Sequence, residues 1–388
     1  MPEKKSLAPF VDYFVNLKST KPTKLDAIDM MIDWRPAARK LDKSLKRTAN
    51  VVGKPAYPAL LLFKGLILQR MYNLSDVELE EQIRDRFSFR RFVGLGAVDD
   101  VPDATTFYRF KNDLLGEKLS EKLFHLILDQ LLKKGDFRQG VSVDATVVQS
   151  SRRPRTTMEI VPNDRSEPDL AEQVKDSQAV DQKAEASISD KLDTAGQLSK
   201  SPSDELQGVS NDEVDHTTAE QVMVTHSDDA EAAWLKKGKK TYYGYKVHMA
   251  SDTEYGLVVG GHVTPANRSD MNELERVLSE IPEEMHDGRC YADKGYTSKA
   301  NREVVRSQGF KDGIMEKATR GKQLTYWQKI RNKCISSVRC GIERIFGTFK
   351  RCRDFVRSRY VGMAKVEQEF FFVALSYNLV RARTLCFG

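Results

Sequence analysis

Three carboxylates occupy sequence contexts in which charge is unusual and phosphate chemistry is possible. They are Asp144 in VSVDATVV, Asp293 in YADKGY and Glu343 in RCGIERIFGTFK. Carboxylate oxygens are the ligands that Mg²⁺ and Mn²⁺ prefer. Two such ions about 3.5–4 Å apart can stabilise the attacking and the leaving oxygen of a phosphodiester exchange. The three residues therefore indicate a two-metal phosphoryl-transfer site.

Glu343 lies in a segment of helical periodicity together with Arg339 and Lys350. At about 100° per residue, Arg339, Glu343 and Lys350 project at roughly 0°, 40° and 20°, which makes one polar stripe. Apolar side chains project beside the stripe, at roughly 240–340°: Ile342, Ile345, Phe346 and Phe349. The stripe is thus expected at the edge of a core. The alternative is a surface helix with an ordinary Arg–Glu pair four residues apart.

The two aspartates are set among apolar residues. Asp144 interrupts a run that reads as a strand apolar on both faces, where a lone carboxylate costs several kcal/mol unless it is paired or holds a cation. Asp293 ends a short strand and precedes a glycine turn, and ligands bind at the carboxyl ends of strands in open α/β sheets. For each aspartate the alternative is a capping or salt-bridged side chain.

Several motifs carry a resemblance to a known family. They are VDAT at 143–146, YYGYKVHMASD at 242–252, the TPAN..D run at 264–270, ADKGY at 292–296, R-x3-E-x6-K at 339–350, FVRSRYVGM at 355–363 and YPALLLFKGLILQRMYNLSD at 57–76. With them the chain resembles the insertion-sequence transposases of the RNase H-like DDE superfamily, in the insertion-sequence-4 and insertion-sequence-5 group. One departure is Ser336, where that group usually has a tyrosine.

The resemblance implies roles for individual residues. Asp144 would bridge two Mg²⁺ ions, for which Mn²⁺ can substitute, and Asp293 and Glu343 would each complete one metal site. Arg339 and Lys350 would hold phosphate oxygens, the first as a fork and the second as a point charge. Lys294 and Tyr296 are further candidates for DNA phosphate binding. His248 and Trp327 are expected to be structural, although Trp327 could instead stack on an extruded base.

The activity that the resemblance implies is DNA transposition. The enzyme would cleave the ends of an insertion sequence to free 3′-hydroxyl groups and transfer these strands to target DNA, acting as a homodimer on double-stranded DNA with terminal inverted repeats. Two alternatives remain open. One is an RNase H-like DNA endonuclease without strand transfer, and the other is a catalytically silent regulator that binds the ends.

The charge is distributed unevenly. Of the 388 residues, those between Thr156 and Ala233 include 19 acidic and 5 basic ones, a balance of −14, so the remainder carries +20 of the net +6. A basic remainder favours a polyanionic partner such as DNA. The acidic segment, 156–233, has few aromatic residues, and we expect most of it to be disordered or loosely helical. It would be an inert linker or a DNA mimic.

The order of elements predicts two domains. Residues 1–139 form an all-helical N-terminal domain, either a helix-turn-helix-like DNA reader or a scaffold for dimerisation. Residues 140–388 form an α/β catalytic domain, an RNase H-like mixed sheet flanked by helices in the order β-β-β-α-β-α-β-α, interrupted by the acidic insertion 156–233.

The compartment follows from cysteine usage and hydropathy. The five cysteines show no C-x-x-C spacing and no paired histidine, which argues for a reducing environment and against zinc. We read no apolar run of about 20 residues and no signal-peptide core in the sequence, and expect a soluble, cytoplasmic, nucleoid-associated prokaryotic protein without a membrane partner.

Overall fold

The computed structural model describes four ranges of the chain: 23–45, 56–135, 140–161 and 220–387. The described residues form two compact units. One unit contains the residues up to Pro154 and from Ser227 onwards, and the other contains residues 155–226. The predicted boundary between residues 139 and 140 lies within the first unit and stays a prediction.

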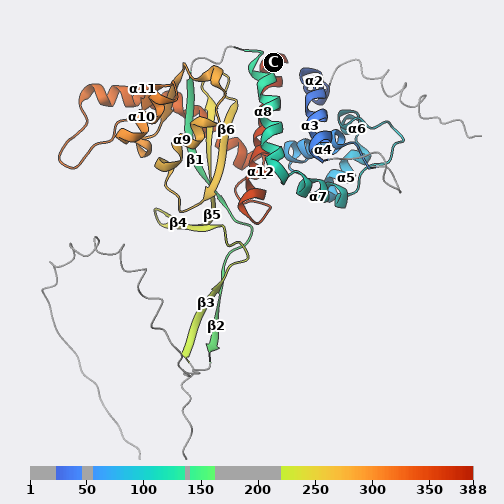
Figure 1. Cartoon of the computed structure of the whole chain (residues 1–388), viewed down its shortest axis with the longest axis horizontal. Coiled ribbons are helices and arrows are strands. Elements are labelled where there is room, and N and C mark those ends of the chain that lie inside the picture. Colours follow the sequence, from blue (N-terminus) through green and yellow to red (C-terminus); the bar gives the residue numbers. More distant parts are fainter. Residues whose placement is uncertain (1–22, 46–55, 136–139, 162–219, 388) are drawn as a thin grey trace, which may run out of the picture. The chain divides into compact units, whose positions relative to one another are not determined.

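The second unit is a β-hairpin where it is described (Figure 1). Strand β2 (Arg155–Val161) pairs antiparallel with β3 (Glu220–His226). The ends of 156–233 thus form strands, whereas its central part, 162–219, on which the expectation of a mostly disordered or loosely helical segment depends, lies outside the described residues. The acidic composition of the whole segment concealed two short runs of high strand propensity, TTMEIV and QVMVTH.

The described residues from 23 to 135 contain helices and no strand. The helices are α2 (Lys24–Met31), α3 (Arg35–Leu45), α4 (Ala59–Tyr72), α5 (Asp76–Asp85), α6 (Phe87–Val93), α7 (Ala104–Asp113), the 3₁₀ turn η1 (Gly116–Lys118) and α8 (Leu119–Leu132). Helix α4 is mostly apolar around its circumference and lies at the centre of this group, where even its Lys64, Gln69 and Arg70 are buried. A Cβ on Gly65 would lie 2.5 Å from the ring of Phe107, so glycine permits α7 to pack closely on α4.

A six-stranded mixed sheet forms the other half of this unit. Its strands are β1 (Gly140–Gln149), β4 (Ala233–Lys237), β5 (Lys240–Asp252), β6 (Val258–Pro265), β7 (Arg289–Ala292) and β8 (Lys311–Ile314). The hydrogen-bonded order is β4-β5-β1-β7-β8, and β6 also pairs with β5. Strand β1 is antiparallel to β5 and parallel to β7, which is in turn parallel to β8. The central strand is therefore the one that holds Asp144.

The predicted alternation of strands and helices is found in the structure. Between the strands lie η2 (Asp270–Glu273), α9 (Leu274–Ser279), η3 (Glu283–Met285), η4 (Lys294–Tyr296) and α10 (Lys299–Ser307), and two long helices follow, α11 (Tyr326–Cys352) and α12 (Met363–Phe387). The chain is thus a mixed α/β protein whose mixed sheet is flanked by helices, as the sequence predicts.

Helix α12 packs against both the sheet and the helices that precede it. It contacts β6 on the sheet, and α4 and α8 among the helices. Its Phe371 and Phe372 lie 5.4 and 5.7 Å, between ring centroids, from Phe124 and Phe63. By length and composition α12 could also cross a membrane, which the sequence prediction overlooked, but 56% of its most apolar window is buried inside the protein. Core packing accounts for that hydropathy.

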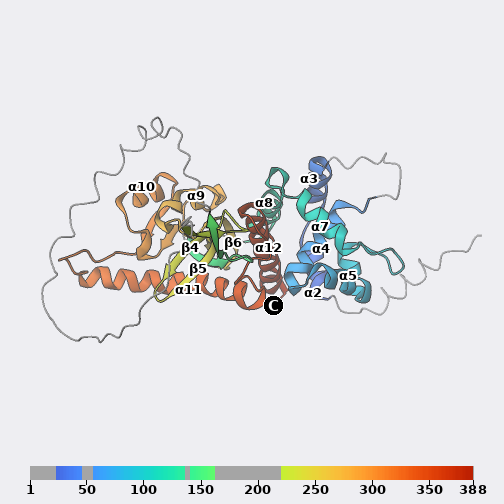
Figure 2. The same cartoon turned by 90° about the horizontal axis from the view of Figure 1, so that it is seen from below.

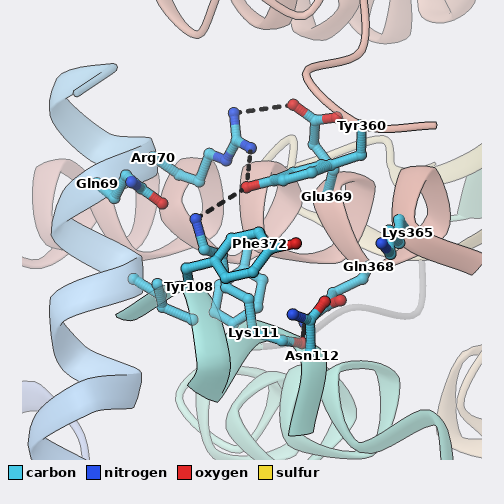
Figure 3. Close-up of a pocket in the computed structure, with 11 residues that line it drawn as sticks. Gln69, Arg70, Tyr108, Lys111, Asn112, Tyr360, Lys365, Gln368, Glu369 and Phe372 are labelled. Atoms are coloured by element: carbon cyan, nitrogen blue, oxygen red, sulfur yellow. Dashed lines mark hydrogen bonds and ion pairs between the residues drawn. The ribbon is translucent and has the colours of Figure 1, made fainter. Parts of the chain in front are cut away.

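A buried ion pair joins α4 to α12 (Figure 3). The Arg70 guanidinium lies 2.9 Å from a carboxylate oxygen of Glu369, and the two side chains are only 4% and 1% exposed. The other oxygen of Glu369 accepts hydrogen bonds from the hydroxyl of Ser358, at 2.6 Å, and from the backbone N–H of Arg359, at 3.1 Å. Ser358 in turn donates its N–H to the carbonyl of Gln149 at the end of β1, at 2.8 Å. Glu369 therefore ties the helices to the central strand.

We expect Glu369→Ala to lower the free energy of unfolding by about 3–5 kcal/mol, because it leaves the charge of Arg70 buried without an anionic partner. Glu303, whose pair with Lys299 is 62% and 94% exposed, provides the matched control, and Glu303→Ala should cost less than about 1 kcal/mol. Urea unfolding followed by circular dichroism measures both variants. Equal effects of the two substitutions would show that the buried pair does not support the fold.

Candidate active site

Asp144 and Asp293 lie on neighbouring parallel strands. Val143 of β1 is in register with Ala292 of β7, and each aspartate is the next residue along its strand. Parallel strands are about 4.8 Å apart, so the two carboxylates start from adjacent positions on the same face of the sheet. Asp293 follows the end of β7, where its side chain accepts a hydrogen bond from the N–H of Lys294 at 2.7 Å and so opens η4.

Arg339 of α11 links Asp144 to the third carboxylate. Its Nη1 donates to Oδ2 of Asp144 at 2.7 Å, and its Nη2 donates to Oε1 of Glu343 at 2.7 Å. The apolar face of α11, which includes the buried Ile342 and Ile345, holds the helix in this position. The predicted polar stripe is therefore found at the edge of the core, and it faces Asp144.

In this site burial disfavours the charged forms of the side chains, and their pairing with opposite charges favours these forms. Burial raises the pKa of Asp144 above its usual value, although the charge of Arg339 and the N–H of Ala145 act in the opposite direction, and the nearby charge of Asp293 adds to the rise. Burial also opposes the charge of Arg339, but Asp144 and the other two carboxylates hold the pKa of the guanidinium above its ordinary value. Glu343 is the open side of the site, with 59% of its side chain exposed.

The donor set fits a divalent cation in its chemistry, since it consists of carboxylate oxygens. The Arg339 guanidinium shows that this place already accommodates positive charge between Asp144 and Glu343. In this arrangement no three of the described histidine, cysteine, aspartate or glutamate residues are gathered closely enough to bind a metal ion. Arg339 thus stands where a cation would be needed, and it contacts the carboxylates, whereas the sequence predicted a contact with phosphate.

Lys350 lies in a basic hollow next to the carboxylates. The hollow has a volume of about 570 Å³ and also contains Thr146, which is two residues beyond Asp144 on the same face of β1. Its other charged side chains are Arg153, Lys237 and Lys240, and no acidic residue lines it. Burial, and then repulsion from Lys237, lowers the pKa of Lys350. No site role was predicted for the lysines of β4 and β5, although they form a basic run in the sequence.

The two remaining candidates differ in exposure. Lys294 is exposed on the turn after Asp293. Tyr296 is only 2% exposed, its buried hydroxyl has no hydrogen-bond partner among the described residues, and burial raises its pKa well above the usual value, with further contributions from Asp270 and Asp144. Tyr296 therefore lies beneath the site and offers no open surface to phosphate in this structure.

The positions of the His248 and Trp327 side chains follow from strand pairing and from packing. His248 pairs with Ala145, so it points to the face of the sheet opposite to Asp144. It is fully buried, its ring nitrogen lies 2.9 Å from the Thr264 hydroxyl, and burial lowers its pKa to about 3, which fits the predicted structural role. The preferred prediction for Trp327, a core position, is wrong, because its side chain is 75% exposed.

Two parts of the chain match known protein families. Residues 213–379 match the family described as Transposase DDE domain, and residues 13–113 match the family described as Transposase domain (DUF772). The first match includes Asp293 and Glu343 and leaves Asp144 outside it. The insertion-sequence-4 and insertion-sequence-5 group is not distinguished by these matches and stays a prediction.

A curated relative agrees with the domain matches. The chain is 36% identical over 170 residues to the transposase for insertion sequence element IS1106 of Neisseria meningitidis serogroup B, an alignment that covers 44% of this chain and 58% of that protein. Among solved structures, the piggyBac transposase synaptic complex with hairpin DNA overlaps 95% of this chain and 83% of that chain, at 9% identity and a TM-score of 0.37, too loosely to identify a fold. In these two ranges and in its curated relative, the chain is similar to DDE-domain transposases of insertion sequences.

Proposed function

We propose that this protein cleaves the ends of an insertion sequence and joins the freed 3′-hydroxyl strands to target DNA. The observation that carries the proposal is the convergence of Asp144, Asp293 and the Arg339–Glu343 pair from three separate segments of the chain at one edge of the core. The strand order, with an antiparallel β5 and parallel β7 and β8 around β1, supports an RNase H-like catalytic domain.

Asp144, Asp293 and Glu343 would hold two divalent cations, Mg²⁺ or Mn²⁺. Such ions supply charge for the attacking and leaving oxygens of the phosphodiester. Asp144 is set to lie between the other two, because it is adjacent to Asp293 on the sheet and shares Arg339 with Glu343. Its position in the central strand fixes its backbone, which favours a bridging role.

Arg339 and the basic hollow would bind the DNA backbone. A guanidinium that exchanges carboxylate for phosphate makes two charge-assisted hydrogen bonds in either state. Its transfer to DNA therefore leaves the number of these bonds unchanged. Lys350, Lys237 and Lys240 offer point charges beside the carboxylates, and Lys294 offers another on the turn after Asp293. These positions would lead a strand across the site.

The remaining parts of the proposal come from the family. The partners would be double-stranded DNA with terminal inverted repeats and a target duplex, held by a homodimer in a prokaryotic cytoplasm. A strand-transfer assay with Mg²⁺ or Mn²⁺, an end duplex and a target plasmid tests the function directly. Joined products support a transposase, cutting without joining supports an endonuclease, and binding without either supports a silent regulator.

Asp293→Asn should reduce cleavage by more than the roughly 10- to 100-fold loss typical of residues that only orient metal ligands. The substitution keeps the shape of the side chain and removes the charge that a cation needs. Asp287→Asn, at an exposed aspartate in the turn before β7, is the control and should cleave normally. Cleavage of end duplexes resolved on gels gives the rates, and a fully active Asp293→Asn enzyme would remove this residue from the site.

Arg339→Gln should tighten Mn²⁺ binding to the DNA-free protein by about tenfold or more, because a charged hydrogen bond to the carboxylates worth about 1.5–3 kcal/mol no longer competes with the metal. Titration followed by electron paramagnetic resonance measures free Mn²⁺ without any need for activity. Arg344→Gln, at an exposed position on the same helix, is the control. Unchanged or weaker Mn²⁺ binding in Arg339→Gln would show that the guanidinium does not occupy a cation position.

Replacing Lys237 and Lys240 by glutamine should flatten the dependence of DNA affinity on salt. Each lost phosphate contact lowers the slope of log K against log salt by about 0.9 on duplex DNA. The same change at Lys236 and Lys239 removes equal charge from the same hairpin but outside the hollow, and it should leave the slope nearly unchanged. Equal slopes for the two double variants would mean that the hollow is not a phosphate site.

A further inference from the structure

The first turn of α11 carries two large aromatic side chains in solvent. Tyr326 and Trp327 are 71% and 75% exposed, and their rings lie edge to face with centroids 5.5 Å apart. Ile330, one turn further on, is also exposed. A contiguous group of exposed apolar side chains rimmed by polar residues is typical of a binding surface.

This part of the helix extends beyond the core (Figure 2). No side chain of α11 before Ile335 is buried. The turn is nevertheless held in place, because Thr325 caps the helix, Asn332 exchanges hydrogen bonds with the backbone of Glu316, and Arg331 pairs with the Glu316 carboxylate at 2.9 Å. The aromatic rings are thus presented on a braced segment.

The bracing contacts and the rings lie on different faces of the helix. Taking Tyr326 as 0°, Ile330 and Trp327 project at roughly 40° and 100°, and Arg331 and Asn332 at roughly 140° and 240°. Lys333 and Lys329 project at roughly −20° and −60°, on the side of Tyr326 opposite to Trp327, and the bracing contacts lie on the far side of the helix from Tyr326. The outward face therefore combines two aromatic rings, one aliphatic side chain and two lysines.

The surroundings are basic. Five exposed cations on this loop and turn have no ion-pair partner among the described residues: Lys317, Arg320, Lys322, Lys329 and Lys333. From Met315 to Cys334 the one acidic residue is Glu316, and it is already engaged by Arg331 and Arg302. Aromatic rings among free cations match the chemistry of a DNA strand, which offers base faces between phosphates.

We propose that the Tyr326–Trp327 surface binds unpaired nucleobases of a DNA strand. The bases stack on the two rings, and the flanking phosphates lie against the lysines. Bases inside a duplex already stack on their neighbours, so the open ring faces select single strands, frayed ends or extruded bases. The inference rests on the proposed action on DNA, and it adds a site that the carboxylates do not require.

The helix sets the distance between this surface and the carboxylates. Sixteen residues separate Trp327 from Glu343, which corresponds to about 24 Å along the helix axis. At about 3.4 Å per stacked nucleotide this is roughly seven nucleotides. A strand that lies in the active site would therefore present unpaired bases to the rings at about that separation from the cleaved bond.

The test uses the full-length protein without added metal and fluorescein-labelled oligothymidine of about 20 nucleotides, with a blunt duplex of the same length for comparison. Tyr326→Ala/Trp327→Ala should weaken single-strand binding by about tenfold or more and duplex binding by less than about twofold. The single variant Trp327→Phe keeps a stacking face and should retain most of the single-strand affinity that the double variant loses. Phe387→Ala, an exposed aromatic at the end of α12, is the matched control.

Three results would overturn the proposal, and a fourth would separate it from the transposase function. Unchanged single-strand affinity in the double variant, or an equal loss on single and double strands, would show that the rings do not stack on bases. Loss of self-association in sedimentation with DNA binding intact would show that the rings contact a second copy of the chain. A wild-type protein that binds oligothymidine through Trp327 but does not cut element ends would uphold this site and contradict the transposase function.

Discussion

The burial of Asp144 in the central strand is the constraint on which the catalytic half of the protein depends. An unpaired carboxylate at that depth would cost several kcal/mol, and Arg339 offsets the cost with a direct charged hydrogen bond. Because Arg339 belongs to α11, this helix must cross the sheet at β1 and β7, and its apolar face secures it there. Glu343 follows one turn later and shares the same guanidinium.

In this structure one guanidinium bridges Asp144 and Glu343. Under the proposed function the same side chain would pass to a phosphate of the DNA when the cations bind. The rest of α11 extends this logic, since a helix of 27 residues is a stiff rod about 40 Å long. It carries the exposed aromatic pair at one end and Lys350, in the basic hollow, at the other. One element therefore sets the spacing of every DNA contact proposed on it.

Glu369 has a comparable role where the sheet meets the helices of residues 23–135. It is buried on α12 and satisfies Arg70 of α4 together with the loop that follows α11. That loop hydrogen-bonds to Gln149, five residues beyond Asp144 on the same strand. The helices of residues 23–135 and the central strand are thus joined through buried polar groups, which are costly to leave unpaired and so resist displacement.

The sequence by itself determined the local elements and the candidates for the chemistry. Asp144 and Asp293 were visible because they interrupt or end an apolar run, and Glu343 because it shares the polar stripe of an amphipathic helix. Such patterns record contacts between residues near in the chain, and for the same reason the alternation of strands and helices after residue 240 was predicted. The segment 156–233 was the exception, where two short strands were hidden by the composition of the whole.

The tertiary structure alone decided which side chains meet. Arg339 was expected on phosphate and is found on the carboxylates, Tyr296 was expected at an open site and is buried, and Trp327 was expected in the core and is exposed. The basic hollow also unites Arg153, Lys237, Lys240 and Lys350 from three segments. Each of these outcomes depends on how a helix or hairpin is placed against other segments of the chain, which for Arg339 and Asp144 are 195 positions apart. Periodicity shows that a helix has a buried face, but only long-range packing determines what that face and its edges contact.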